Sequence, residues 1–364
     1  MPSVAVVGSG LAGFTAYQTL RRVLPPDEIA VYGTDADPAA VWRVHAAAIR
    51  QCEMRSESDG HCLPSSFPGL AFSSVRRRRS LRPLLESVLD HYHPTVDEFL
   101  AHVERLRGRS GWDESFVLSH VGRVEAVDGG FELDGQPFRH ALLALGHPGL
   151  NVPGELRNDA RVVHSYEPHE YAATVTVVGA GLAAATEWLN ALAAGAEVVS
   201  VRRREPERRP LNVPRHYFSR RGLAGYHRLT PRERVERLRA LSAPSYPAGA
   251  QWDEPLERAS REGRFRVEQS VNGSAQVICA TGFRKGFRHD PLLARLVAEH
   301  DVQTADDWLV LDPDSTVPGL SDETRTLGVA GVPGQWAFPA ADTLAGARYA
   351  AHRFLQRIQA CRTR

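Results

Sequence analysis

Short apolar runs alternate along the chain with longer segments that have the periodicity or composition of helices. The apolar runs occupy residues 4–7, 28–32, 141–146, 174–178, 197–201, 276–283 and 326–331. Runs of this length, many rich in β-branched residues, are typical of strands buried on both faces of a parallel sheet. Helices are predicted at residues 14–23, 95–106, 182–194 and 231–241, and short antiparallel strands at 117–133. The pattern predicts an α/β fold.

The first apolar run leads directly into a glycine-rich turn with the spacing G-x-G-x-x-G. Its residues are Gly8, Ser9, Gly10, Leu11, Ala12 and Gly13. In such a turn the first glycine permits a tight bend, the second lets a pyrophosphate approach the backbone, and the third brings helix and strand together. The N–H groups at the start of the helix attract phosphate. A plain strand–turn–helix is the alternative, but the position of the turn between a strand and a helix favours dinucleotide binding.

A second turn of the same kind follows the run at 174–178. Its residues are Gly179, Ala180, Gly181, Leu182, Ala183 and Ala184, which have the spacing G-x-G-x-x-A. Two such turns in one chain predict two Rossmann-like domains and a reaction between two cofactors. Arg202 and Arg203 follow the next strand, where a permanently charged arginine suits the 2′-phosphate of NADPH. A solvated basic loop is the alternative.

The end of the second predicted strand lacks the acidic residue that normally binds the adenosine ribose. Gly33 stands there, and Asp35 is the nearest substitute, unless it is simply a solvated loop residue. Near the end of the chain, Asp342 and Leu344 open the last helix. Asp342 is positioned to cap that helix, and it could also hydrogen-bond a cofactor hydroxyl.

Composition limits the class of protein. With 364 residues the chain is long enough for two domains, and its formal net charge of +1 suggests neither a nucleic-acid nor a membrane partner. The arginine run at 76–79 is interpreted as a solvated loop. No C-x-x-C pair, basic-then-apolar leader or membrane-spanning run is present, so we expect a cytoplasmic protein with free thiols. No metal site is expected, because the spacing of His45, Cys52, His61 and Cys62 fits no zinc pattern.

Taken together, these motifs resemble those of the flavin-containing monooxygenase group, which are two-domain FAD and NADPH enzymes related to Baeyer–Villiger and N-hydroxylating monooxygenases. The first glycine turn matches their FAD turn, and Trp42 and Arg43 match the end of their Gly-Gly-x-Trp segment, with Ala39 and Ala40 where glycines are usual. Gly146 lies in a segment similar to their first interdomain linker, and Thr281 and Gly282 lie in a close match to the second. His164 belongs to a segment similar to the one that precedes their NADPH domain.

The resemblance implies a discontinuous FAD-binding domain, residues 1–150 and 276–364, with an NADPH-binding domain inserted at 151–275. Residues 205–262 are expected to form a small, variable helical part of the inserted domain.

The resemblance also implies a reaction. NADPH would reduce FAD, and O2 would add to the reduced flavin as a flavin peroxide that oxygenates a small molecule, an amine or sulfide in preference to a ketone. Glu57 and His61 are the polar residues expected in the flavin-facing loop. Two alternatives remain open: an NADPH-dependent flavin reductase without oxygenation, and a non-catalytic FAD-binding redox sensor. The sequence predicts neither the substrate nor the oligomeric state.

Overall fold

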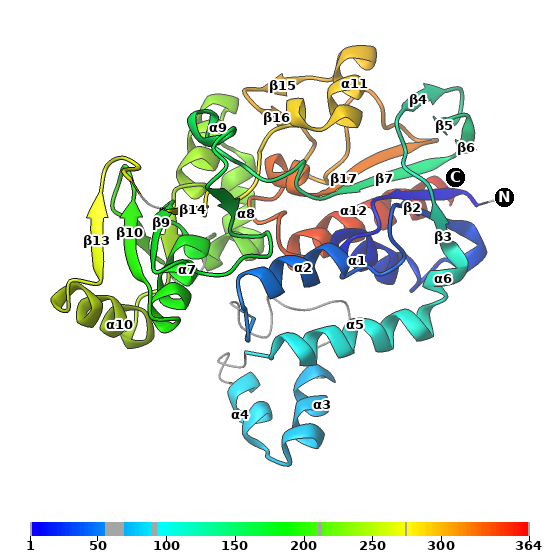
Figure 1. Ribbon diagram of the computed structural model, residues 1–364. Coiled ribbons are helices and arrows are strands. Elements are labelled where there is room, and N and C mark those ends of the chain that lie inside the picture. Colours follow the sequence, from blue (N-terminus) through cyan, green and yellow to red (C-terminus); the bar gives the residue numbers. More distant parts are fainter. Residues whose placement is uncertain (1, 55–68, 89–92, 210–212, 274, 363–364) are drawn as a thin grey trace.

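The structure is a computed structural model that describes residues 2–54, 69–88, 93–209, 213–273 and 275–362. Two five-stranded sheets dominate it, and every strand pair within them is parallel. This confirms the predicted α/β fold with two Rossmann-like units (Figure 1). None of the described helices is both long and apolar enough to cross a membrane.

The first sheet has the strand order β17-β7-β1-β2-β3. Its strands are β1 (Val4–Val7), β2 (Ile29–Gly33), β3 (Phe116–Leu118), β7 (His140–Leu145) and β17 (Thr326–Gly331). Alternate residues of β1 face different cores: Val4 and Val6 lie in the cluster with α1 (Leu11–Leu20) and α12 (Leu344–Arg362), while Ala5 and Val7 lie in the opposite one. Both faces are buried, which is why these strands read as continuous apolar runs.

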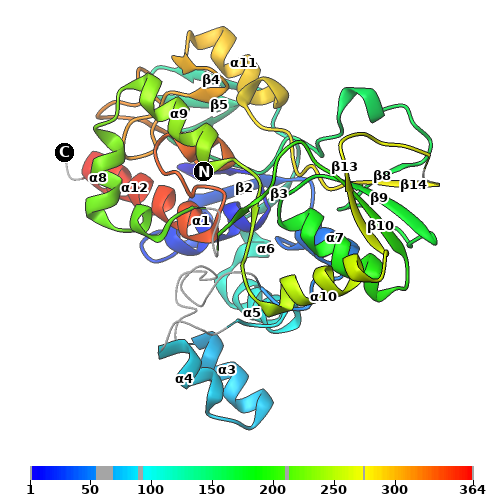
Figure 2. The same ribbon diagram turned by 90° about the vertical axis from the view of Figure 1, so that its left-hand side faces the viewer.

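The second sheet has the order β13-β10-β9-β14-β8. Its strands are β8 (Val162–His164), β9 (Thr174–Val178), β10 (Glu197–Val201), β13 (Phe265–Glu268) and β14 (Gln276–Cys279). Helices α7 (Leu182–Ala193) and α10 (Ala250–Arg261) contact each other beside this sheet (Figure 2). Strand β14 belongs here and not to the first unit, so the predicted boundary at residue 276 falls too early by one strand.

The remaining elements connect or cover these units. The helices are α2 (Ala40–Ala48), α3 (Gly69–Arg78), α4 (Arg82–Val88), α5 (Val96–Ser110), α6 (Trp112–Ser115), α8 (Arg220–His227), α9 (Pro231–Leu241) and α11 (Pro291–His300). The short strands are β4 (Val124–Val127), β5 (Gly130–Leu133), β6 (Gln136–Phe138), β11 (Glu207–Arg208), β12 (Ser245–Tyr246), β15 (Thr304–Ala305) and β16 (Trp308–Leu309). Strands β4, β5 and β6 form an antiparallel meander, of which β4 and β5 confirm the antiparallel strands predicted at 117–133. Residues 117 and 118 correct that prediction, because they belong to β3, which pairs parallel with β2. The capping box of Thr95 and Glu98 at α5 is present.

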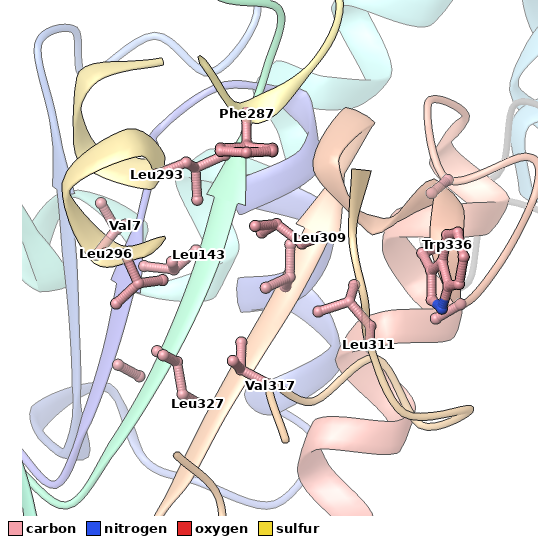
Figure 3. Close-up of a cluster of buried hydrophobic side chains, with 14 of the residues drawn as sticks. Val7, Leu143, Phe287, Leu293, Leu296, Leu309, Leu311, Val317, Leu327 and Trp336 are labelled. Atoms are coloured by element: carbon pink, nitrogen blue, oxygen red, sulfur yellow. The ribbon is translucent and has the colours of Figure 1, made fainter. Parts of the chain in front are cut away.

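Helices α8 and α9 correct our expectation for residues 205–262. Tyr226 and Leu238 lie in the same buried cluster as Trp336, part of which Figure 3 shows beside strands β7 and β17. The Nε2–H of His227 donates a 2.7 Å hydrogen bond to the carbonyl oxygen of Ala337. Apolar side chains therefore draw these helices onto the first unit, away from the second sheet to which we assigned them.

Candidate functional site

Both glycine turns occupy equivalent places. Each follows the central strand of its sheet, β1 or β9, and opens the next helix, α1 or α7. Gly10 and Gly181 are the N-cap residues of these helices, and neither cap receives a side-chain hydrogen bond. Half-buried Leu11, Ala12, Leu182 and Ala183 form the first turns. No N-cap side chain occupies the N–H groups at either helix start, so these groups are free of that competitor for a phosphate.

The first and third positions of the motif are dictated by the fold. Gly8 has φ +114°, and a Cβ on it would lie 2.4 Å from the carbonyl oxygen of Ala144. A Cβ on Gly13 would lie only 1.8 Å from the carbonyl oxygen of Gly8. Gly179 repeats the first case, with φ +140° and a 2.4 Å approach to the carbonyl oxygen of Ala280. These glycines are explained by the turn alone.

The second position of the motif is different. Gly10 has φ −71° and Gly181 has φ −89°, values that any residue adopts. A Cβ on either glycine would meet no atom within 4 Å. Nothing in the protein therefore requires glycine at these two places. Open space above a glycine at a helix N-terminus is what the close approach of a pyrophosphate needs.

The end of β2 is small and neutral. A Cβ on Gly33 would lie 2.0 Å from the Ser9 hydroxyl oxygen, so the serine side chain fills the space that a residue-33 side chain would use. Asp35 lies exposed in the loop beyond, where its Oδ1 accepts the N–H of Asp37 at 2.8 Å.

The end of β10 is basic. The Arg202 side chain is only 12% exposed, its guanidinium lies 5.4 Å from the ring centre of Trp188, and it pairs with Glu205 at 3.0 Å. Arg208 lies 4.0 Å over the ring of Tyr246, which in turn packs edge-on against Trp188. The Arg203 side chain, by contrast, is 90% exposed. The structure thus separates two arginines that the sequence presented as equals.

The two interdomain crossings pair with each other. The N–H of Asn151 donates to the carbonyl oxygen of Gly282, and the N–H of Arg284 donates to that of Gly149, each at 2.9 Å. The hydroxyl of Thr281 donates to the carbonyl oxygen of Asn151. Gly146 leads into the first crossing as an exposed residue. The pairing agrees with our expectation that the two glycine-ended runs serve as paired crossings.

An aromatic stack, which the sequence analysis missed, fixes this junction. The ring of Phe283 lies between His147 at 4.0 Å and Tyr166 at 4.8 Å, with interplanar angles of 15° and 14°. His45 from α2 lies 5.5 Å from Phe283. His164 bonds through Nε2 to the carbonyl oxygen of Gly282 at 2.9 Å, while its Nδ1 accepts the N–H of Tyr166. Since these residues are far apart in sequence, no local pattern reveals the stack.

Three ionisable side chains line a partly enclosed but solvent-accessible surface beside this stack. Desolvation, helped by the charges of Lys285 and His45, lowers the pKa of His147 to about 4. Desolvation also lowers the pKa of Lys285, the only lysine of the chain, and raises that of Asp342, although each charge counteracts the shift of the other. All three side chains retain solvent access, as expected of groups on the wall of a ligand site.

The start of α12 corrects one prediction. Thr343, and not Asp342, accepts the N–H of Gly346 at 3.1 Å, which is the capping hydrogen bond. Asp342 is therefore left for another role, and Leu344 begins the helix. Close to the ends of β7 and β17 lies a small concavity, open to solvent, whose lining includes Gly146, Val332, Asp290 and Asp307.

Other predicted site residues have structural contacts. Trp42 packs edge-on against Phe99 at 5.1 Å, and Arg43 pairs with Asp37 at 3.1 Å. Glu57 and His61, the two candidate catalytic residues, lie outside the described residues. Among the described residues, no cluster of histidine, cysteine or carboxylate side chains could hold a metal ion.

The architecture consists of two Rossmann-like units, with the strands of the second inserted in the chain between β7 and β17 of the first. The chain matches no family model and no curated protein. It is similar in structure to ornithine hydroxylase PvdA from Pseudomonas aeruginosa, with 16% identity, coverage of 98% of this chain and 99% of that one, and a TM-score of 0.71. It is also similar to ornithine N-hydroxylase KtzI from Kutzneria sp. 744, with 15% identity, coverage of 99% of this chain and 99% of that one, and a TM-score of 0.74. For bacillithiol disulfide reductase Bdr from Bacillus cereus the identity is 15%, the coverage is 100% of this chain and 99% of that one, and the TM-score is 0.62. At these identities the likeness establishes the fold.

Proposed function

We propose that the chain is an FAD- and NADPH-dependent monooxygenase that inserts one oxygen atom of O2 into an amine. The observation that carries the proposal is the pair Gly10 and Gly181. Both are glycines that the backbone does not need, both stand at helix N-termini, and both face open space. Two pyrophosphate sites in one chain fit a hydride transfer between two dinucleotides.

FAD is assigned to the unit of β1, and NADPH to the unit of β9. The assignment is supported by charge, because the strand end beside the first turn carries Gly33 and the strand end beside the second carries Arg202. The Arg202 guanidinium, which lies 5.4 Å from the ring centre of Trp188, offers a planar, permanent cation to a 2′-phosphate. The first unit would comprise β1 to β7 and the chain from 280 onward, together with α8 and α9.

When bound, the flavin supplies the electron transfer and oxygen activation. The balanced reaction converts an amine, O2, NADPH and a proton to a hydroxylamine, water and NADP⁺. The chain's own contribution is to orient the two cofactors and exclude water. Helix N-termini would hold the pyrophosphates, and Asp342 would accept a hydrogen bond from a hydroxyl of the flavin side chain. The aromatic stack around Phe283 would hold the two units at a fixed distance.

An amine is favoured over a sulfide or a ketone. Three of the structurally similar proteins are described as ornithine, lysine and cadaverine monooxygenases or hydroxylases. A reducing compartment such as the cytoplasm fits the three described cysteines, which are all free.

The test is to load the purified protein with FAD and supply NADPH, ¹⁸O2 and a panel of amines, sulfides and ketones. We expect amine-stimulated NADPH oxidation and a hydroxylamine that carries one ¹⁸O atom. NADPH oxidation that yields only hydrogen peroxide with every substrate would contradict oxygenation.

The second candidate is a flavin-dependent reductase, favoured by the match to bacillithiol disulfide reductase. It predicts NADPH oxidation that depends on a disulfide or another electron acceptor, with no ¹⁸O incorporation. Against it, two of the three described cysteines, Cys279 and Cys361, are buried. If NADPH failed to bleach the bound flavin at all, both enzymes would be excluded in favour of a redox sensor.

A further inference from the structure

The two units carry different residues at one equivalent position. In each unit the first glycine of the motif donates its N–H to the neighbouring strand. These hydrogen bonds run from Gly8 to the carbonyl oxygen of Tyr32 at 2.8 Å and from Gly179 to that of Val201 at 3.0 Å. The next residue is therefore structurally equivalent in both units. It is Gly33 in the first and Arg202 in the second, so neither unit has the carboxylate that usually binds a ribose there.

The side chain of Ser9 occupies the space that a side chain at residue 33 would need. The hypothetical Cβ of residue 33 would lie 2.0 Å from the hydroxyl oxygen of Ser9, 2.3 Å from its Cβ and 3.0 Å from its backbone N, so any side chain would displace the serine. The backbone of Gly33 lies in strand β2 and does not itself demand glycine. In the second unit the residue between the two glycines is Ala180, and the position equivalent to Gly33 carries Arg202.

The serine hydroxyl is available to a ligand. Ser9 is only 8% exposed, and among the described residues its hydroxyl makes no hydrogen bond. Ser9 also lies inside the turn itself, one residue before the helix N-terminus at Gly10. A hydroxyl without a protein partner can exchange its water for a ligand group, to which it can both donate and accept. Asp35 is a poorer candidate, because it is exposed and its Oδ1 already accepts the N–H of Asp37.

We propose that the Ser9 hydroxyl, which lies against Gly33, takes the place of the usual carboxylate and binds the adenosine ribose in the first unit. The ribose-binding group of this unit is then uncharged. The inference rests on the proposed function, in which this unit binds FAD. A hydroxyl can both donate to and accept from a ribose hydroxyl. The resulting hydrogen bond is neutral and therefore about half as strong as one to a carboxylate. Ser9 and Gly33 thus act as one specificity-determining pair.

The experiment measures FAD dissociation constants for the full-length apoprotein by quenching of flavin fluorescence. Ser9→Ala is expected to weaken FAD binding about fivefold, the effect of one neutral hydrogen bond. This loss should vanish with an FAD analogue whose adenosine ribose lacks both hydroxyls, since a merely structural change would persist. Ala180→Ser, the matched change in the second unit, should leave FAD affinity unaltered.

A second set of variants tests the pairing. Ser9→Gly with Gly33→Glu makes room for a carboxylate and should bind FAD at least about tenfold more tightly than Ser9→Gly alone. Gly33→Glu alone should gain nothing, because Ser9 obstructs the new side chain. Equal gains with and without Ser9 would overturn the pairing.

Two further outcomes separate the possible failures. Unchanged FAD affinity in Ser9→Ala, together with weakened binding in Asp35→Ala, would overturn the inference and leave the proposed function intact. No FAD binding by the unaltered protein would instead refute the proposed function. Thermal unfolding of each apoprotein variant checks that the fold is retained.

Discussion

Replacing Gly10 and Gly181 with alanine should separate ligand binding from folding. Most glycines in such turns cannot be tested this way, because their substitution strains the backbone or creates a clash. Gly10→Ala and Gly181→Ala create neither, since φ is negative at both sites and the new methyl group has no neighbour within 4 Å. We therefore expect both apoproteins to fold normally.

The magnitude follows from two opposing effects. Alanine restricts the unfolded chain more than glycine does, which stabilises a compatible site by about 0.4–1 kcal/mol. Glycine is preferred over alanine at an N-cap, which opposes this gain, so in a chain of this size the melting temperature should change by at most a few degrees. The same methyl group holds a pyrophosphate away from the helix N-terminus. Losing one hydrogen bond to a charged oxygen costs about 1.5–3 kcal/mol, or roughly a 10- to 100-fold loss of affinity.

The assay pairs apoprotein melting temperatures with equilibrium binding of each cofactor. Gly10→Ala should weaken FAD alone, and Gly181→Ala should weaken NADPH alone. Gly13→Ala is the control for a glycine that the fold does require, because its Cβ would lie 1.8 Å from the carbonyl oxygen of Gly8. It should lower the melting temperature sharply. If Gly10→Ala instead destabilised the apoprotein and left FAD affinity unchanged, our distinction between the glycines would be refuted.

Further expected outcomes concern the phosphate site, the interdomain stack and a buried histidine. Arg202→Ala should raise the KM for NADPH by roughly tenfold or more and the KM for NADH only a little. Arg203→Ala changes a side chain that is 90% exposed and should change both KM values only slightly. Equal effects of Arg202→Ala on the two KM values would show that the phosphate site lies elsewhere. Phe283→Leu should lower the free energy of unfolding by about 1–3 kcal/mol, because the ring stacks on two others at 4.0 and 4.8 Å; an unchanged denaturant midpoint would contradict this. Burial lowers the pKa of His169, but the hydrogen bonds that its ring donates to the carboxylate of Glu187 and the carbonyl oxygen of Glu167 raise the pKa by more, so the net pKa lies above 6.5. The stabilisation of the folded state by protonated His169 is therefore fully present below about pH 6.5 and is lost as the pH rises through the folded pKa. His169→Gln should flatten the pH dependence of the melting temperature over that range. An unaltered pH dependence would refute the role of His169.

The parallel sheets and both glycine turns were predictable because their signals are local. A strand buried on both faces must be apolar along its whole length, and a strand-to-helix turn must accommodate a tight bend. Val4–Val7 and Gly8 can therefore be recognised from the local sequence alone. The same holds for the capping box of Thr95 and Glu98, which lie three residues apart.

Contacts between distant segments were not predictable in this way. Helices α8 and α9 were assigned to the wrong unit, because their apolar faces, including Tyr226 and Leu238, fit a core to which residues near 336 contribute. The stack of His147, Tyr166 and Phe283 is assembled from three separate segments. Lys285, as the only lysine in the chain, was the one available signal for this region.

The duplication inside the chain shows which motif positions describe the fold and which describe the ligand. At the third position Gly13 cannot accept a methyl group, whereas the equivalent Ala184 carries one and is fully buried. Helix α7 must therefore stand farther from its turn than α1 does, so this difference in sequence reports the packing of helix on strand. The second position is glycine in both units although neither backbone requires it. Because steric packing does not account for Gly10 and Gly181, our proposal of two dinucleotide sites rests on these two residues more than on the full motif.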